Sequence, residues 1–254
     1  MSPEVLFVSA AAAAAAGLMG CFAVAKRMTL AGDALSHVAL PGVAVALALH
    51  VHPLLGAIAA LAFGALLVWT LQERNRMATE TIVGVIFSAA LAIGSMLASG
   101  EDLLDALFGR ASRLTPLEII FGLTMSTAVV AFVLIARRRL IVAIVSPDIA
   151  RTAGINVRRL ELVFLEMFAM TVALGLHYLG VLLMGSLIII PAATAKRMSA
   201  NLNQMLITAA AIAVVVTVVG SLVSVPLRRE SGPVIVTLAA GFFFLSLIRR
   251  RCDG

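Results

Sequence analysis

Residues 204–224 read QMLITAAAIAVVVTVVGSLVS, a stretch without a charged side chain that is long enough to cross the hydrocarbon core of a bilayer as one helix. Similar stretches recur along the chain of 254 residues, of which 62% are hydrophobic and 13% charged, with a mean hydropathy of +1.10. A soluble domain is nearer half apolar and about a quarter charged. The composition therefore excludes an ordinary soluble domain and indicates an integral membrane protein.

Nine apolar runs separated by charged residues predict an all-α, polytopic membrane bundle that occupies 1–254 as a single domain. A count of eight or ten spans would also fit, because the seventh run is short and contains Pro191. The runs are approximately 5–25, 28–49, 53–71, 80–99, 117–136, 160–178, 180–195, 204–224 and 232–248.

The basic residues indicate how this bundle is oriented. With nine spans, fifteen Lys and Arg residues fall in one set of alternate loops and four in the other. Positive charge accumulates on the cytoplasmic side of membrane proteins, so we expect the N-terminus outside and the C-terminus in the cytoplasm. The net charge of +6 therefore reports orientation among membrane lipids, and no nucleic-acid partner is expected.

Ionisable residues inside the apolar runs are candidates for function, because a charge in the bilayer is costly unless it is paired, hydrated or bound to a metal. Asp33 and His37 lie four residues apart, so a helix places them on one face, where they could bind a divalent cation as a gate or a relay. The alternative is a packing helix with an Asp–His hydrogen bond. Glu166 is either a residue of the same path or a partner for a facing Ser or Thr.

Two prolines are expected to break helices near this path. Pro41 removes the helical hydrogen bond to the carbonyl of His37, which would add another oxygen ligand beside the imidazole. Pro191 is the second expected helix break. Interrupted helices often form the substrate path of transporters.

His50 and His52 fall at the outer end of the second run. In a loop, this His-x-His spacing could place both imidazoles on one metal ion of the pathway. They could equally be hydrated polar residues at the membrane interface. His177, at the outer end of the sixth run, is a lesser candidate.

The longest cytoplasmic connection, about 137–159, contains the signals of a short helix. Ser146 is expected as its N-cap, Pro147 at its first position and Gly154 just past its end. Such a helix could transmit force from a docked partner, or merely fill a loop. The residues expected to couple this chain to an ATPase are Pro147, Asp148, Ile149, Ala150, Arg151 and Gly154.

Taken together, these motifs resemble the membrane subunits of the zinc/manganese-type ABC transporter permease family. The resemblance rests on GDALSH at 32–37 with LPG at 40–42, and on blocks at 80–84, 102–104 with 107–109, 150–159, 180–183 with 190–195, and 231–233. It implies a homodimer, or a pair with a paralogue, two cytoplasmic ABC ATPases and an extracytoplasmic metal-binding protein. It also implies that Asp33 and His37 are the pathway carboxylate and imidazole, and that 147–153 is the coupling helix.

No G-x-x-x-x-G-K-[ST] motif occurs in the sequence, so ATP is expected on a partner subunit and this chain is not expected to be an enzyme. We expect no resident cofactor, only the transported metal ion as substrate. Imidazole favours zinc, whereas carboxylate and carbonyl oxygens also suit manganese or iron. The expected location is the cytoplasmic membrane of a prokaryote. The alternatives are a permease for siderophores or cobalamin and a secondary metal transporter driven by an ion gradient.

Overall fold

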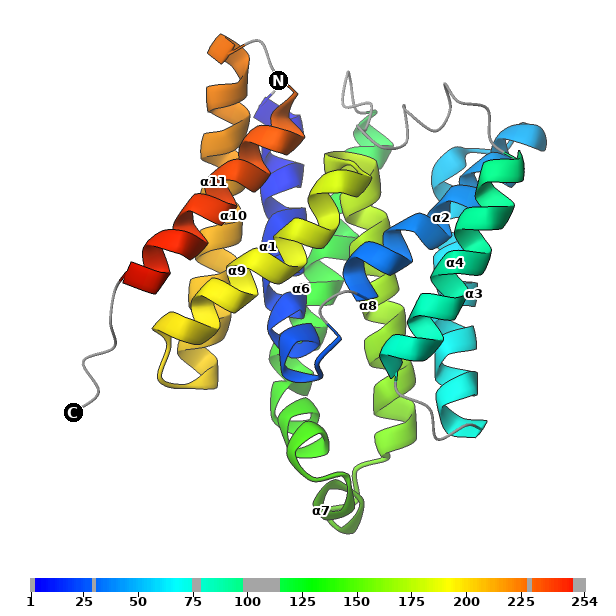
Figure 1. The fold of residues 1–254 in the computed structure, drawn as a ribbon, viewed down its shortest axis with the longest axis vertical. Helices are drawn as coiled ribbons and strands as arrows, with labels where there is room; N and C mark the ends of the chain where they lie inside the picture. Colours follow the sequence, from blue (N-terminus) through cyan, green and yellow to red (C-terminus); the bar gives the residue numbers. More distant parts are fainter. Residues whose placement is uncertain (1–2, 29–30, 75–78, 98–114, 228–229, 249–254) are drawn as a thin grey trace.

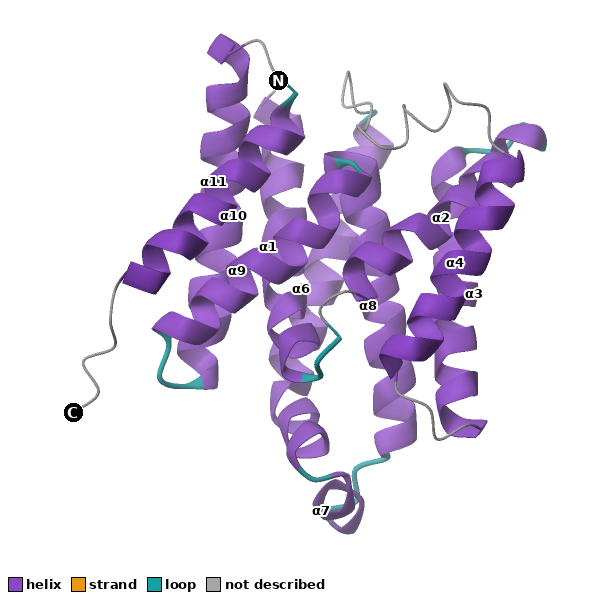
Figure 2. Cartoon of the chain, viewed as in Figure 1, coloured by secondary structure: helices purple, strands orange, loops and turns teal. Residues whose placement is uncertain are grey.

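The computed structural model describes residues 3–28, 31–74, 79–97, 115–227 and 230–248. All regular structure in these ranges is helical (Figure 2). The helices are α1 (Pro3–Ala25), α2 (Ala31–Ala48), α3 (Pro53–Arg74), α4 (Thr79–Leu97), α6 (Pro116–Val145), α7 (Pro147–Thr152), α8 (Val157–Leu179), α9 (Val181–Met198), α10 (Leu202–Leu227) and α11 (Ser231–Ile248).

Each of the nine apolar runs corresponds to one long helix in the described ranges, and α7 is the additional short helix. Six helices are long and apolar enough to span a membrane, while α2 and α4 carry the shorter apolar stretches Ala34–Ala48 and Thr79–Gly94. The predicted all-helical membrane bundle is thus confirmed. The N-terminal end of α1 lies at the end of the bundle opposite α7 (Figure 1).

The expected helix breaks at Pro41 and Pro191 are wrong. Pro41 lies inside α2 and Pro191 inside α9, and both helices continue through the proline. A proline removes only one hydrogen bond of the helix, and packing against neighbouring helices can maintain the backbone around it. The carbonyl of His37 still loses its usual helical donor, because Pro41 has no N–H.

Part of the connection predicted at about 137–159 is helical. Helix α6 continues through Arg137, Arg138 and Arg139 to Val145. Its 30 residues give a length of about 45 Å, more than the roughly 30 Å thickness of a hydrocarbon core, so its last turns extend beyond the membrane. Arginine is a good helix former. The three arginines therefore indicate where the apolar run ends, but the helix continues past them.

Helix α1 lies at the centre of the bundle and packs against α6, α8, α9 and α10 (Figure 1). Small residues allow this close packing. A methyl group added at Gly20 would overlap the backbone of Ile188, and one at Gly17 would lie 2.8 Å from the carbonyl oxygen of Ala209. In a bilayer, where lipid is as apolar as the side chains, such close approach is a main source of helix association.

Helices α2, α3 and α4 form a second group on the other side of α6 and α8 (Figure 1). Within it, Gly42 of α2 and Gly56 of α3 meet backbone to backbone. Helix α8 joins the two groups because it contacts both α1 and α3. Helix α2, which carries Asp33 and His37, contacts α3 and α4 within this group and α8 and α9 outside it.

Candidate functional site

Asp33 and His37 lie on the first two turns of α2. The side chain of Asp33 lies outside the described part of the structure. His37 is half-buried, and its ring meets the ring of Phe87 on α4 edge to face, with centroids 5.3 Å apart. The Nδ1 atom of His37 is buried and makes no hydrogen bond to the described residues. A buried imidazole nitrogen without a partner is available to a ligand.

Glu166 lies on α8 and is half-buried against α3. A cavity of about 20 Å³ adjoins it, lined by Ile58, Ala62, Ala169, Met170 and Ala173. No hydrogen bond or ion pair links Glu166 to another side chain in the described ranges, and the Ser or Thr partner suggested by the sequence is not found there. Its environment in the structure is therefore apolar.

The two histidines of the His-x-His spacing have different environments. His50 is exposed and has a φ of 55°, at the end of α2. The Nε2 atom of His52 lies 3.8 Å from Oε1 of Glu118, and the Nε2 atom of His177 lies 3.4 Å from the same oxygen. The structure thus brings His52 together with Glu118 and His177.

Glu118 is the member of this cluster that sequence reasoning missed. It is the third residue of α6 and forms a capping box with Thr115, whose N–H and Oγ1 donate to Oε2 of Glu118 at 2.7 and 2.8 Å. The Thr-x-x-Glu spacing before an apolar run is a recognisable signal for a helix start. It locates the carboxylate in the fold but gives no indication of its two histidine neighbours.

Within the ranges that the structure describes, no three His, Cys, Asp or Glu side chains form a ready-made metal site. The motif at 102–109 lies outside the described residues.

The short helix predicted after Ser146 is present in the structure. Ser146 is the N-cap of α7, and its Oγ accepts a hydrogen bond from the N–H of Ile149. Gly154 follows the helix with a φ of 77°, a backbone conformation that residues other than glycine rarely adopt. Ala150 is fully buried, whereas Ile149 is 62% exposed. The helix therefore anchors one side to the bundle and leaves an apolar side chain open to a partner.

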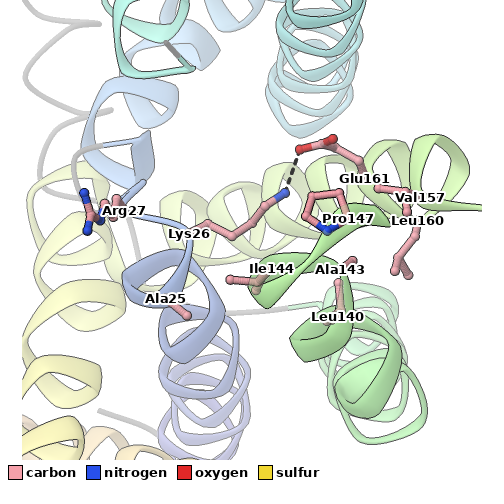
Figure 3. A pocket seen from close by; sticks show the side chains of 10 residues that line it. All are labelled: Ala25, Lys26, Arg27, Leu140, Ala143, Ile144, Pro147, Val157, Leu160 and Glu161. Carbon is pink, nitrogen blue, oxygen red and sulfur yellow. Dashed lines mark hydrogen bonds and ion pairs between the residues drawn. The ribbon is translucent and has the colours of Figure 1, made fainter. Parts of the chain in front are cut away.

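A cavity of about 370 Å³ lies beside α7, between the ends of α1 and α6 and the start of α8 (Figure 3). The Nζ atom of Lys26 crosses this cavity to Oε1 of Glu161, 2.7 Å away. The same Nζ lies 4.9 Å from the ring centroid of Phe164. These contacts connect the turn that leads into α2 with the helix that follows α7.

The end of α3 is attached to the same region. The indole N–H of Trp69 donates to the carbonyl of Arg158 at 3.1 Å, and the guanidinium of Arg158 lies 4.8 Å from the Trp69 ring centroid. The first turns of α8 therefore contact the turn that precedes α2 and the last part of α3.

The profile of the ABC 3 transport family matches residues 2–250. The chain belongs to the ABC 3 transport family. It is a multi-pass membrane subunit of a bacterial ABC importer and is not the ATPase of that system. The resemblance that the motifs indicated is confirmed.

Individual relatives agree with this assignment. The chain is 32% identical over 235 residues to the "Chelated iron transport system membrane protein YfeD" of Yersinia pestis, and the match covers 91% of this chain and 79% of the relative. It is 29% identical over 238 residues to the "High-affinity zinc uptake system membrane protein ZnuB" of Haemophilus influenzae, with 91% of each chain covered. The solved structure "PsaBC from Streptococcus pneumoniae in complex with Fab" has a TM-score of 0.85 at 25% identity, covering 98% of this chain and 91% of that one.

Proposed function

We propose that this permease imports a divalent transition metal ion, with zinc as the favoured cargo and manganese or iron as alternatives. The observation that carries the proposal is the placement of Asp33 and His37 one turn apart at the start of α2, with a buried imidazole nitrogen free of described partners. A carboxylate and an imidazole together suit such an ion. Relatives named for iron and for zinc support the class of cargo.

ATP hydrolysis on a partner subunit is proposed to drive transport through α7. Cytoplasmic ATPases would dock on the exposed side of this helix, around Ile149. Their movement would be transmitted through the first turns of α8, to which Glu161 and Arg158 belong, into the neighbouring Lys26 turn and α3. Helix α2, with Asp33 and His37 in its first turns, follows the Lys26 turn in the chain and packs against α3.

The proposed assembly contains two permease chains, as a homodimer or with a paralogue, and an extracytoplasmic metal-binding protein. An ion released at the outer face would pass the α2 segment on its way to the cytoplasm. Glu166 is proposed as a further residue of this path, although its described surroundings are apolar.

The decisive experiment measures cellular zinc, manganese and iron in a deletion strain grown in metal-limited medium. Strains re-expressing the wild type, Asp33→Ala, His37→Ala and Glu166→Gln are compared. We expect the wild type to restore one metal and the Asp33 and His37 variants to restore none, with equal amounts of each protein in the membrane. Normal metal content in both variants would overturn the proposed path.

The same strains distinguish the alternatives. If Glu166→Gln restores the metal fully, the path belongs to Asp33 and His37 without Glu166. A metal content that is unchanged by deletion, in a strain without another uptake system, would favour a siderophore or cobalamin permease. Uptake that a protonophore abolishes without any need for a partner ATPase would favour a secondary transporter.

A further inference from the structure

Glu118, His52 and His177 lie together at the end of the bundle opposite α7. They come from the start of α6, the turn between α2 and α3, and the last turn of α8, which Figure 1 shows at the same end. This end is the extracytoplasmic face if α7 faces the cytoplasm. We propose that these three side chains form a capture site for a divalent metal ion, separate from Asp33 and His37. This inference rests on the proposed metal transport.

The carboxylate of Glu118 is oriented as a ligand. The N–H and hydroxyl of Thr115 hold its Oε2, which leaves Oε1 directed at the two imidazoles. The hydroxyl of Tyr178 donates to the backbone carbonyl of Glu118 at 2.5 Å and fixes the start of α6 against α8. Such supporting hydrogen bonds are what orient the ligands of metal sites.

The two distances from Oε1 of Glu118 to the imidazole nitrogens are close to those between ligand atoms of an occupied site, and the rings of His52 and His177 lie 6.3 Å apart, centroid to centroid. In a tetrahedral site with metal–ligand bonds of roughly 2.1 Å, neighbouring ligand atoms lie about 3.4 Å apart. Oε1 of Glu118 lies 3.4 Å from Nε2 of His177 and 3.8 Å from Nε2 of His52. The Nε2 atom of His177 is buried, and its described polar contact is the 3.4 Å approach to Oε1 of Glu118.

His52 is the ligand that must move. Its Nδ1 accepts a long hydrogen bond of 3.3 Å from the N–H of Leu54, so in the neutral ring Nε2 carries the proton. Binding of a metal at Nε2 requires this contact to break and the proton to move to Nδ1. The side chain of His52 is 54% exposed, compared with 21% for Glu118 and 22% for His177, so it can rotate at low cost. Glu118 and His177 would bind first, and His52 would close the site.

The helix ends favour a cation at this place. His177 lies in the last turn of α8, where the unpaired carbonyls carry partial negative charge. The N-terminus of α6 stabilises the ionised form of Glu118. A cation between the two therefore meets a carboxylate, two imidazoles and a helix C-terminus.

The test is Co²⁺ binding to the full-length protein in detergent. Binding is measured from the visible d–d absorption bands that tetrahedrally coordinated Co²⁺ produces. The His37→Ala background removes the contribution of the α2 segment. In that background we expect the wild-type cluster to give the bands, and Glu118→Gln and His177→Ala to weaken Co²⁺ binding at least about tenfold. His50→Ala is the matched control, because His50 lies two residues from His52 but outside the cluster, and it should leave the bands unchanged.

The proposal would be overturned if either cluster variant keeps the bands or if the parent protein lacks them. It would also be overturned if His50→Ala loses them. The Glu118→Gln variant keeps an acceptor for the Thr115 cap, and His177→Gln replaces His177→Ala if the alanine variant fails to elute as a folded protein. The readout is independent of transport. Absence of Co²⁺ bands with normal metal import would refute this site alone, whereas intact bands in a protein whose deletion leaves cellular metal content unchanged would refute the proposed function alone.

Discussion

The ammonium nitrogen of Lys26 lies 2.7 Å from Oε1 of Glu161 and joins the turn after α1 to the second turn of α8. The two side chains are 18% and 32% exposed, so the pair is shielded more than a surface ion pair. Asp33 follows this turn in the chain and α7 precedes α8, so the pair joins the helix after the proposed coupling helix to the turn before the proposed metal path.

We expect Lys26→Ala to lower the free energy of unfolding by about 1 kcal/mol and to reduce metal uptake per ATP hydrolysed, because it removes a partly buried pair. Melting temperature in detergent and coupled ATPase and uptake assays check this. The charge-reversed double variant Lys26→Glu/Glu161→Lys should recover most of both properties. Asp148→Ala, which removes the exposed ion pair with Arg151, is the control for stability and should change it by less than about 0.5 kcal/mol.

Gly154 has a positive φ of 77°, and no atom lies near the position that a Cβ would occupy. A substitution there therefore tests the backbone conformation alone. We expect Gly154→Val to destabilise the end of α7 by about 1–2 kcal/mol and to uncouple ATP hydrolysis from uptake. Gly154→Asn, which tolerates this conformation, should remain coupled. Normal coupling in Gly154→Val would argue against a role for this turn, and uncoupling by both variants would show that its positive φ is not the cause.

Much of the fold could be predicted because the bilayer imposes its own pattern. Each span needs a long apolar run, and nine runs with asymmetric positive charge correspond to nine long helices in the described ranges. The predictions failed where the end of an apolar run, or a proline within it, does not coincide with the end of a helix. Arg137 to Arg139 end the apolar run but not α6, and Pro41 interrupts the hydrogen bonding of α2 but not its course.

The candidate site was predictable only in part. Asp33 and His37 were found because an ionisable pair at helical spacing stands out in an apolar run. The cluster of His52, Glu118 and His177 is not predictable in this way, because its members come from three elements distant in the sequence. Lys26 and Glu161 are likewise 135 residues apart. Such contacts depend on how the helices pack, which local spacing does not encode.

Gly42 of α2 and Gly56 of α3 face each other where the two helices cross. A Cβ on either would overlap the carbonyl oxygen of the other. We expect Gly42→Ala or Gly56→Ala to destabilise the protein by about 1–3 kcal/mol and to separate α2 from α3. Gly241→Ala is the control, since a Cβ there meets nothing within 4 Å, and it should be neutral or stabilising by up to about 1 kcal/mol. Equal melting temperatures for all three variants would contradict the close crossing.

Ile149 is the exposed apolar residue of α7, and its neighbour Ala150 is fully buried. If an ATPase docks there, burial of this side chain should contribute about 1.5–3 kcal/mol to binding. We expect Ile149→Asp to reduce co-purification of the ATPase at least about tenfold while leaving the melting temperature of the permease unchanged. Ile149→Leu should bind normally, because it retains the apolar surface. Normal ATPase binding by Ile149→Asp would show that the partner contacts another part of the cytoplasmic face, and α7 would then be only a connection between α6 and α8.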